Sequence, residues 1–534
     1  MKRVVVILAT LALSVTAFGV ARAEWCDVRR PCNVRVTSIS STSVSLAWNA
    51  PSAMTGFAAY DVRRLDQGAN AYQSVAQGPN PSYTDNDVTP GRIYSYRVVQ
   101  LDASGNVLGT SFPLTLTTPL DAASGPTPRP SPTLDTPPPP ASIFLAPASI
   151  VADCSVDVTA ALNNWVASVP NGTAAKANIL RFPAGACYRV DGSVGAPYDR
   201  NPAGFDRHYL VFEGNGATID GHFATPAPYT NRAGLGLTSS SYITIDGLVI
   251  KGSHPNPCNL ETPDGPCRQL PDNGGGFDGR YEWNHGIGLY GDDHMTVRNV
   301  HIFNAYGDGV TIAQDPQSTN VVVESSTIIG TGRMAVGVTS ADGVTIRNNV
   351  FDRISYHGID LEPEVRTITN VTIEGNTLKR HYLGFISAVT GLCLPRSNYT
   401  IRNNIMEASG ITSFPPIAIS RAAGCTAANK GLTISGNTFL RTDGSAGPPA
   451  ADNAAVQIGG WDEITVDNNR IIQARTDTAP VRLTGVASVV HMSGNDMREN
   501  PWVYSYNGVN DSLDLNVQDC GNITSQGSSI PTAC

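Results

Sequence analysis

Residues 31–119 consist of short runs in which apolar and polar positions alternate. The clearest runs are 34–36, 44–48 and 94–98, and segments rich in Pro, Gly and Asn separate them. Alternation with a period of two is typical of strands that bury one face, and turns at such intervals are typical of an antiparallel sandwich. The pattern therefore predicts a small β-sandwich in this part of the chain.

A helical pattern follows a proline-rich stretch. Between 155 and 169 the apolar residues recur on one face at helical spacing: Val158, Leu162, Trp165, Val166 and Val169. Ser155 is suited to cap the first turn, so we predict an amphipathic helix over 155–169. Short apolar segments punctuated by glycine come next, which indicates strands.

The rest of the chain repeats a unit of apolar residues, a pair of small or Asn residues, and apolar residues again. The equivalent positions are Asn299, Ser326, Asn349, Asn376, Asn404, Asn437, Asn469 and Asn495. Repeats of this length without helices predict a solenoid of about eleven coils whose strands stack into parallel sheets. We expect the recurrent residues at bends, in left-handed conformation and hydrogen-bonded to the next coil. The helix at 155–169 would cover the first coil.

The N-terminal region resembles a fibronectin type III domain. The resemblance rests on SVSLAW followed by proline, on AAYDVRRLD, and on YTDNDVTPGRIYSYRVVQLDASGN. It implies that Trp48 is the core tryptophan and Tyr94 the corner tyrosine. Such modules are usually spacers or adhesive units without catalysis.

The repeat region resembles the pectate-lyase-like superfamily of right-handed parallel β-helices. The segments that carry the resemblance are GNGATIDG and the opening DCSVDVTAALNNW…FPAGACY. The expected fold is all-β: a right-handed parallel β-helix with an N-terminal capping helix, preceded by a fibronectin type III sandwich. The superfamily includes pectate lyases, polygalacturonase-like hydrolases and alginate epimerases.

Four segments are expected. A basic pair, an apolar run and an Ala-Arg-Ala motif predict a cleaved signal peptide at 1–23, and hence a secreted, extracellular protein. The sandwich follows at 24–119, and the proline-rich linker at 120–142 is expected to be an extended, semi-rigid spacer. The β-helix occupies 143–534. No later apolar stretch is long enough to span a bilayer.

The charge of the chain restricts its partners. Lys and Arg number 36 and Asp and Glu 45, a net charge of −9. Removal of residues 1–23 leaves 33 basic and 45 acidic residues, a net charge of −12. Such a chain has no general electrostatic reason to bind nucleic acid or an anionic membrane. The expected partner is an extracellular polysaccharide, and we expect a monomer, with a trimer left open.

Ten cysteines fall in neighbouring pairs along the chain. The simplest disulfide pairing is Cys26/Cys32, Cys154/Cys187, Cys258/Cys267, Cys393/Cys425 and Cys520/Cys534. An even count in an exported protein is typical of disulfides. Zinc is disfavoured because the chain has no CxxC pair and no His cluster at ligand spacing.

Glycine-led strands of successive coils predict one face of the solenoid. Segments that begin at Asn284, Gly307, Arg333, Tyr356 and Tyr382 align with one another, and each ends in an inward apolar residue. The residues after these segments are expected to point outward: Gly288, Thr311, Gly337, Asp360 and Ile386.

One coil on this face carries a run of acids. Asp360, Glu362 and Glu364 alternate along it and would share one face of a strand. The alignment puts Asp308 in the row of His357, with His285 a further coil away and Arg333 on the coil between. Carboxylates beside these groups and Tyr356 suit carbohydrate chemistry, because a pair can act as acid and base or as acid and nucleophile. Crowded like charges also keep one proton available.

These residues give the candidate site. The predicted catalytic residues are Asp360, Glu362, Asp308, His357 and Arg333. The predicted substrate-binding residues are Glu364, Tyr356, His285, Trp283 and Tyr281. The other interpretation is that three solvent-facing carboxylates bind Ca²⁺ or only supply solubility.

An insertion at 252–283 interrupts the repeat. It contains the Cys258/Cys267 loop, three consecutive glycines at 274–276, and the aromatic residues Phe277, Tyr281 and Trp283. Long loops of a solenoid usually lie on its binding side, and exposed aromatic rings stack on sugars. Local packing of these rings is an equal alternative.

No family's catalytic set is present intact. Alginate epimerases have a G-F-D-P-H-type motif where this chain reads GIDLE, and the polygalacturonase signatures NTDG, GHG and RIK are absent. The leading hypothesis is a glycoside hydrolase that uses Asp360 and Glu362 with Asp308 or His357 and requires no cofactor. A Ca²⁺-assisted lyase or epimerase-like enzyme is the second hypothesis. A non-catalytic adhesin or glycan-binding protein is the third.

Overall fold

The computed structural model describes a large part of the 534-residue chain. The described residues are 31–40, 42–50, 56–66, 72–89, 93–111, 114–118, 142–196, 201–255, 278–314, 316–364, 366–389, 391–407, 415–421, 425–440, 454–471, 479–485, 490–498, 503–506, 509–510, 517–524 and 527–528. They belong to two compact units, Met1–Thr136 and Pro137–Cys534. The predicted signal peptide and nearly all of the predicted linker lie outside the described residues.

The first unit is a sandwich of antiparallel strands. One sheet contains β1 (Cys32–Ile39), β2 (Val44–Asn49) and β5 (Ser82–Asp85). The other contains β3 (Phe57–Asp66), β4 (Gln73–Gly78), β6 (Ile93–Asp102), β7 (Val107–Thr110) and β8 (Leu114–Thr117).

Two aromatic residues of the sandwich are placed as the sequence predicts. Trp48 is buried and packs edge-on against Tyr60, with the ring centroids 5.3 Å apart. The Tyr94 hydroxyl accepts a hydrogen bond from the backbone N–H of Thr89 at 2.7 Å. This bond ties the start of β6 to the preceding turn, as a corner tyrosine does.

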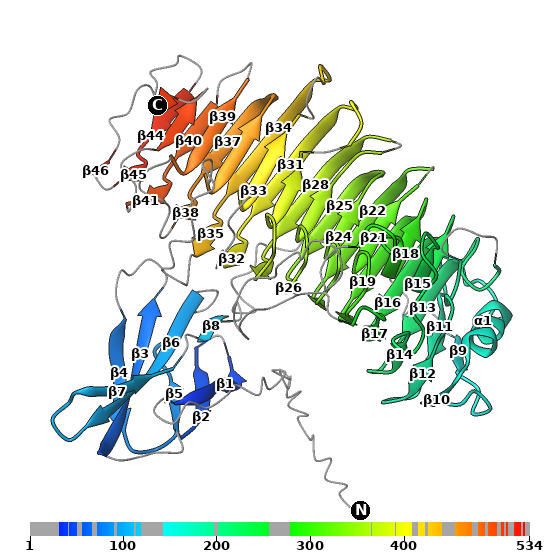
Figure 1. The fold of residues 1–534 in the computed structure, drawn as a ribbon, viewed down its shortest axis with the longest axis horizontal. Coiled ribbons are helices and arrows are strands. Elements are labelled where there is room, and N and C mark those ends of the chain that lie inside the picture. The colour runs from blue at the N-terminus through cyan, green and yellow to red at the C-terminus, as the bar shows by residue number, and fades with distance from the viewer. Residues whose placement is uncertain are drawn as a thin grey trace, which may run out of the picture. The chain divides into compact units, whose positions relative to one another are not determined.

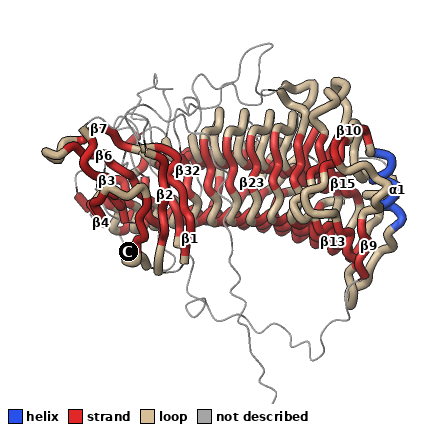
Figure 2. The backbone as a smooth tube through the Cα atoms, turned by 90° about the horizontal axis from the view of Figure 1, so that it is seen from below, coloured by secondary structure: helices blue, strands red, loops and turns tan. Residues whose placement is uncertain are grey.

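The second unit is a stack of coils whose strands form three long sheets (Figures 1 and 2). Sheet 1 contains β10 (Asp153–Asp157), β12 (Cys187–Arg189), β14 (Thr218–Asp220), β17 (Val249–Lys251), β20 (His301–Phe303), β23 (Thr327–Ile329), β26 (Val350–Asp352), β29 (Thr377–Lys379), β32 (Ile405–Glu407), β35 (Thr438–Leu440), β38 (Arg470–Ile471), β41 (Asp496–Met497), β45 (Ile523–Thr524) and β46 (Gly527–Ser528).

Sheet 2 contains β9 (Ser142–Leu145), β11 (Asn178–Arg181), β13 (His208–Glu213), β16 (Ser241–Asp246), β19 (Asp293–Arg298), β22 (Ser318–Glu324), β25 (Ala341–Arg347), β28 (Ile368–Glu374), β31 (Arg396–Arg402), β34 (Asn429–Ser435), β37 (Trp461–Asp467), β40 (Val490–Ser493) and β44 (Val517–Cys520). Sheet 3 contains β15 (Arg232–Thr238), β18 (Asn284–Tyr290), β21 (Val310–Ala313), β24 (Val336–Val338), β27 (Ile359–Leu361), β30 (Ile386–Ala388), β33 (Ile417–Ser420), β36 (Val456–Gly459), β39 (Val481–Thr484), β42 (Tyr504–Tyr506) and β43 (Val509–Asn510).

Almost all of these strands are parallel. In the described part of the chain, sheets 1, 2 and 3 hold 14, 13 and 11 strands, and only β46 and β43 join their sheets antiparallel. A predominantly parallel stack of this kind is a β-helix, as the sequence predicts. The coil number of about eleven falls within the range of these strand counts.

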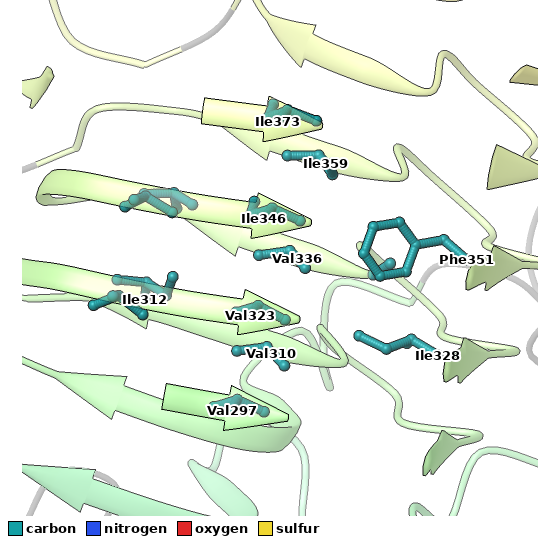
Figure 3. Close-up of a cluster of buried hydrophobic side chains, with 14 of the residues drawn as sticks. Val297, Val310, Ile312, Val323, Ile328, Val336, Ile346, Phe351, Ile359 and Ile373 are labelled. Atoms are coloured by element: carbon teal, nitrogen blue, oxygen red, sulfur yellow. The ribbon is translucent and has the colours of Figure 1, made fainter. Parts of the chain in front are cut away.

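The core lies between the three sheets. Val323, Ile346 and Ile373 stack along sheet 2, with Val336 and Ile359 of sheet 3 facing them (Figure 3). All five side chains are buried, and they belong to one continuous apolar cluster of the second unit. Each coil therefore buries its apolar face only by stacking on its neighbours.

A ladder of buried side chains crosses the bends between sheets 2 and 1. Its members are Ser326, Asn349, Asn376, Asn404, Asn437, Asn469, Asn495 and Asn522. The Oδ1 atom of each asparagine accepts the backbone N–H of the preceding member. From Asn349 to Asn495, the Nδ2 atom donates to a strand carbonyl and to the next Oδ1. The predicted hydrogen-bonded ladder is therefore present.

Two details of the predicted ladder are wrong. The left-handed conformation belongs to the residue before each ladder member, such as Asn348 with φ +57° and Asn403 with φ +56°. Asn299 is one of these preceding residues, with φ +53°, and Val300 stands at the ladder position. A buried asparagine that bonds to both neighbouring coils has no freedom to make the bend itself, so the exposed residue before it does.

The N-terminal end is covered by α1 (Thr159–Ser168), which is shorter than predicted. Ser155 is not its cap, because strand β10 continues to Asp157 in parallel pairing with β12. The apolar face is as expected: Leu162, Trp165 and Val166 are buried in the same core cluster as the coils.

A buried arginine holds this helix on the stack. The guanidinium of Arg207 donates to the carbonyls of Val166 at 3.1 Å and Val169 at 2.6 Å, at the C-terminal end of α1. A cation is favourable there because the last carbonyls of a helix lack intrahelical partners.

Two predicted disulfides are present, Cys154–Cys187 and Cys393–Cys425. Each of the other predicted pairs includes a cysteine outside the described residues: Cys26, Cys258, Cys267 and Cys534. In the part of the chain that the structure describes, no helix is long and apolar enough to cross a membrane.

Candidate active site

The candidate residues lie on and beside sheet 3, where the register of four strands fixes their rows. One row of paired residues crosses these strands: Ile287 of β18, Val310 of β21, Val336 of β24 and Ile359 of β27. This confirms the predicted alignment of the first four segments. The fifth is one residue out, because Phe385 takes the glycine position and Ile359 pairs with Ile386. Ser387, not Ile386, therefore follows Asp360 in the outward row.

A glycine brings two acids of different coils together. Gly337 lies in the outward row directly beside Asp360. A Cβ atom on Gly337 would come within 2.5 Å of Oδ2 of Asp308, so the Asp308 carboxylate lies over this glycine. The absence of a side chain at 337 thus allows Asp308 to approach the Asp360 position across the intervening strand.

Arg333 joins two of the carboxylates. Its guanidinium lies 3.4 Å from Oδ2 of Asp308 and 3.2 Å from Oε2 of Glu362. Because both oxygens lie next to nitrogens of the same planar guanidinium, they are at most about 9 Å apart. Burial lowers the pKa of Arg333, but the attraction of the surrounding carboxylates outweighs it and raises that pKa above its ordinary value. Arg333 therefore stays charged.

Asp360 points outward, as predicted, but it is not solvent-facing. Its residue is only 3% exposed, while its neighbours Ile359 and Leu361 are in the core. Burial raises the pKa of Asp360 to about 6, partly opposed by Arg333. Its Oδ1 atom has no hydrogen-bond partner among the residues that the structure describes. Near neutral pH this carboxyl group can therefore gain or lose a proton.

Glu362 and Glu364 do not continue the strand with Asp360. Strand β27 ends at Leu361, and Pro363 follows, so the predicted three-acid strand face is absent. Glu362 turns to Arg333 and its side chain is 22% exposed, whereas Glu364 is exposed. Glu362 is thus a partly accessible member of the ion-paired group.

Asp308 is held on several sides. It is fully buried, and Oδ1 accepts the backbone N–H of Met334 at 3.2 Å. Burial raises the pKa of Asp308, while Arg333 and the Met334 hydrogen bond act against this. Asp308 is therefore the buried partner that holds the Arg333 guanidinium in place.

The histidines of the site are buried. The Nδ1 atom of His285 accepts the backbone N–H of Asp308 at 3.0 Å, and burial lowers the pKa of His285 to about 3. Burial also lowers the pKa of His357 to about 4. Both rings are therefore neutral near pH 7. Near pH 7 neither ring carries an imidazolium proton to donate, and Nδ1 of His285 is already engaged by the backbone of Asp308.

The aromatic candidates differ in accessibility. Trp283 is 45% exposed, immediately before β18. Tyr281 packs on Tyr306, with the ring centroids 4.7 Å apart, which supports the local-packing alternative. Tyr356 is half-buried and lies edge-on to His357 at 4.8 Å. Phe277 and the glycines at 274–276 lie outside the described residues.

Glu282 belongs to the site although it is not among the residues predicted from the sequence. It is half-buried in the segment before β18, and burial raises its pKa. Arg333, Asp308 and Glu362 all act on its charge. The sequence signal that could have identified Glu282 is its position between Tyr281 and Trp283, both of which were predicted to bind substrate.

One group of side chains has metal-ligand geometry in the described part of the chain, namely Cys154, Cys187 and Asp220. The two cysteines form a disulfide, so they are not available as thiolate ligands. Of the three carboxylates in the predicted Ca²⁺ alternative, Glu362 is ion-paired with Arg333.

Replacing Asp360 by asparagine is expected to stabilise the protein at neutral pH. The folded-state pKa of about 6 lies above the unfolded value of about 4, so the unfolding free energy of the wild type falls as pH rises through this window. Asp360→Asn removes this loss, and the variant should be about 2 kcal/mol more stable at pH 7 but not at pH 4. Urea unfolding at both pH values measures this. An equal difference at both would contradict the assignment.

Comparison with known families agrees with the two units. The family model described as "Right handed beta helix region" matches residues 209–378 and 335–529. The model described as "Fibronectin type III domain" matches residues 29–117.

Curated relatives match over a short segment. An alpha-amylase of Niallia circulans is 36% identical over 89 residues, which is 17% of this chain and 6% of the relative. Chitinase A1 of the same organism and exoglucanase B of Cellulomonas fimi are each 34% identical over 88 residues, or 16% of this chain and 12% and 8% of those proteins. The chain thus spans only a small part of these relatives.

Two solved structures that match the chain have low sequence identity to it. A family 28 exopolygalacturonase of Yersinia enterocolitica is 13% identical, with a TM-score of 0.41 over 94% of this chain and all of that one. A tailspike protein of the E. coli bacteriophage HK620 is 14% identical, with a TM-score of 0.45 over 72% of this chain and 66% of that one. With the family match covering more than half of its residues, the chain belongs to the right-handed β-helix region family and carries an N-terminal fibronectin type III domain.

Proposed function

We propose that the protein is an exported enzyme that hydrolyses a polysaccharide at the carboxylates around Arg333. The observation that carries the proposal is the ion-paired group itself. Arg333 joins Asp308 to the partly exposed Glu362, next to a buried Asp360 whose pKa is about 6. Two carboxyl groups in unlike environments are what glycosidic bond hydrolysis requires.

The roles follow from the two environments. Glu362, beside a permanently charged guanidinium, is the ionised carboxylate that activates a water molecule or attacks the anomeric carbon. Asp360, protonated below about pH 6, is the proton reservoir for the departing oxygen. Water is consumed: its hydroxyl goes to the anomeric carbon and its proton to the departing oxygen. Trp283 offers an exposed ring for stacking on a sugar.

The matched relatives support a carbohydrate substrate. An alpha-amylase, a chitinase and an exoglucanase each share a segment of 88 or 89 residues with this chain, about the length of its fibronectin type III match. In this interpretation the N-terminal unit is an accessory module to a polysaccharide-acting domain. Export is part of the proposal, and the two disulfides fit an oxidising compartment.

A panel of acidic and neutral polysaccharides tests the proposal. New reducing ends and the ultraviolet absorbance of unsaturated products would be followed together, with and without Ca²⁺. The expected result is an increase in reducing ends without absorbance and without a requirement for Ca²⁺. Absorbance that rises with Ca²⁺ would replace hydrolysis by a lyase reaction, and no product from any member would point to a binding protein.

The pH dependence is a further expected outcome. Because the proton on Asp360 is required and is lost as pH rises through about 6, kcat/KM should fall tenfold per pH unit on the alkaline side. Initial rates between pH 4 and 8 measure this limb. A rate that is constant or rises through pH 6 would exclude Asp360 as the proton source.

A further inference from the structure

The site has a strong excess of negative charge. Five carboxyl groups act on one another through space, and we call them the carboxylate cluster: Glu282, Asp308, Asp360, Glu362 and Glu364. In the part of the chain that the structure describes, the cations that act most strongly on its members are Arg333 and the more distant, buried Arg396. The balance of these residues is five negative charges against two positive ones when all carboxyl groups are ionised, and four against two when Asp360 carries its proton.

Neither cation is available to an anionic ligand. Arg333 is already engaged by Asp308 and Glu362. Arg396 is only 2% exposed and donates to the carbonyls of Ala388 and Ser420. A carboxylate on an incoming sugar would therefore meet the cluster without a free guanidinium from either of these two residues.

The histidines do not change this balance. His285 and His357 are buried and uncharged near neutral pH, and so is His381, whose pKa burial lowers to about 3. Positive charge from imidazolium groups is thus absent from these three positions.

Asp360 supplies independent evidence that the cluster is not fully compensated from within. It is 97% buried, and its Oδ1 atom has no hydrogen-bond partner among the described residues. Gly337 beside it leaves the space through which Asp308 approaches. A buried carboxyl oxygen without a donor costs free energy unless a ligand provides one.

We propose that the substrate bears hydroxyl or protonated amino groups at this site and no carboxylate, so that amino-sugar polysaccharides are preferred to neutral ones and uronic-acid polymers are rejected. The inference rests on the proposed function for the location of the substrate. Its physical basis is the field of the cluster, which attracts a cationic sugar and repels an anionic one by the same Coulomb interaction.

Binding of one cationic, one neutral and one anionic hexasaccharide tests this inference separately from catalysis, with the neutral one expected to lie between the other two in affinity. The probes are the hexamers of glucosamine, N-acetylglucosamine and galacturonic acid, titrated into the full-length protein at about pH 6, low salt and low temperature. We expect the glucosamine hexamer to bind more than tenfold tighter than the galacturonic acid hexamer. The gap should shrink at high salt, because exposed charges are screened there.

A matched pair of variants locates the effect. Glu364→Gln removes one exposed charge at the cluster, and Glu463→Gln removes one exposed charge on sheet 2. The first should weaken the glucosamine hexamer about threefold at low salt, and the second should leave it unchanged. Equal effects would mean attraction to the acidic protein as a whole and would overturn the proposal.

The remaining outcomes separate this inference from the proposed function. Binding of the galacturonic acid hexamer as tightly as the glucosamine hexamer, or no measurable binding of the glucosamine hexamer, overturns the charge preference even if the enzyme cleaves a polysaccharide. The expected binding order without cleavage of any polysaccharide supports the charge preference and overturns the hydrolase.

Discussion

Replacing Glu362 by glutamine is expected to lower kcat/KM for the polysaccharide about a thousandfold, the range for removal of a group that acts on the reacting atoms. The amide has nearly the same shape but is uncharged, so it neither activates water nor stabilises positive charge at the anomeric carbon. It also keeps an oxygen within reach of Arg333, which now lies 3.2 Å from the carboxylate. Initial rates of reducing-end formation measure the effect.

A glutamate elsewhere on the β-helix provides the control. Glu407 in β32 is also half-buried and ion-paired, 3.1 Å from Nζ of Lys379 on sheet 1. Glu407→Gln therefore changes a similar ion pair outside the site and should leave kcat/KM within a factor of two. A loss smaller than tenfold in Glu362→Gln, or an equal loss in both variants, would exclude Glu362 as a catalytic residue.

Replacing Asn404 by alanine is expected to lower the free energy of unfolding by about 5 kcal/mol. The Asn404 side chain accepts two hydrogen bonds from Asn376, at 2.9 and 3.0 Å, and donates to the carbonyl of Ile373 and to Asn437. It is fully buried, so its removal leaves these groups without water or a partner. Urea unfolding followed by circular dichroism measures the change.

The residue before it gives a closely matched control. Asn403 is exposed with φ +56°, and glycine occupies the equivalent positions 375 and 436. Asn403→Gly should therefore change stability by less than 1 kcal/mol, because glycine adopts this conformation readily. Similar losses in the two variants would show that the bend, and not the ladder, stabilises the stack.

The fold could be predicted from the sequence because its periodicity is enforced by burial. Each coil repeats apolar positions that face the same core, and a one-residue slip would expose them. The four segments aligned through glycine or alanine at 286, 309, 335 and 358 are in the predicted register. The predicted alignment of the fifth segment is one residue out because Phe385 occupies the position where the other segments have a small residue. Nothing in the local pattern indicates this difference.

Elements that depend on contacts between coils were predicted less well. The start of α1 is set by pairing of β10 with a strand more than 30 residues later, which overrides the capping propensity of Ser155. Asn299 fits the repeat by residue type, but the ladder position belongs to Val300. Local propensity does not distinguish the bend residue from the buried one after it.

The candidate site, too, was predicted where it follows from the repeat and not where it depends on contacts between coils. Because solenoid register is regular, Asp308, Arg333 and Glu362 could be predicted to lie in one region, and ion pairs join them in the structure. The burial of Asp360 and the end of β27 before Glu362 could not be predicted, since both depend on groups from other coils. Glu282 was missed because it lies in an insertion, where no repeat indicates its neighbours.

Isotope incorporation during cleavage tests the central claim most directly, namely that Glu362 and its neighbours hydrolyse a glycosidic bond. The protein and its Glu362→Gln variant would be incubated in oxygen-18 water with the substrate found in the panel. The masses of the products would then be measured by mass spectrometry. The account predicts one oxygen-18 atom per cleaved bond with the wild type, at a rate about a thousandfold lower in the variant. Unlabelled, unsaturated ends, or labelling at the same rate in both proteins, would contradict it.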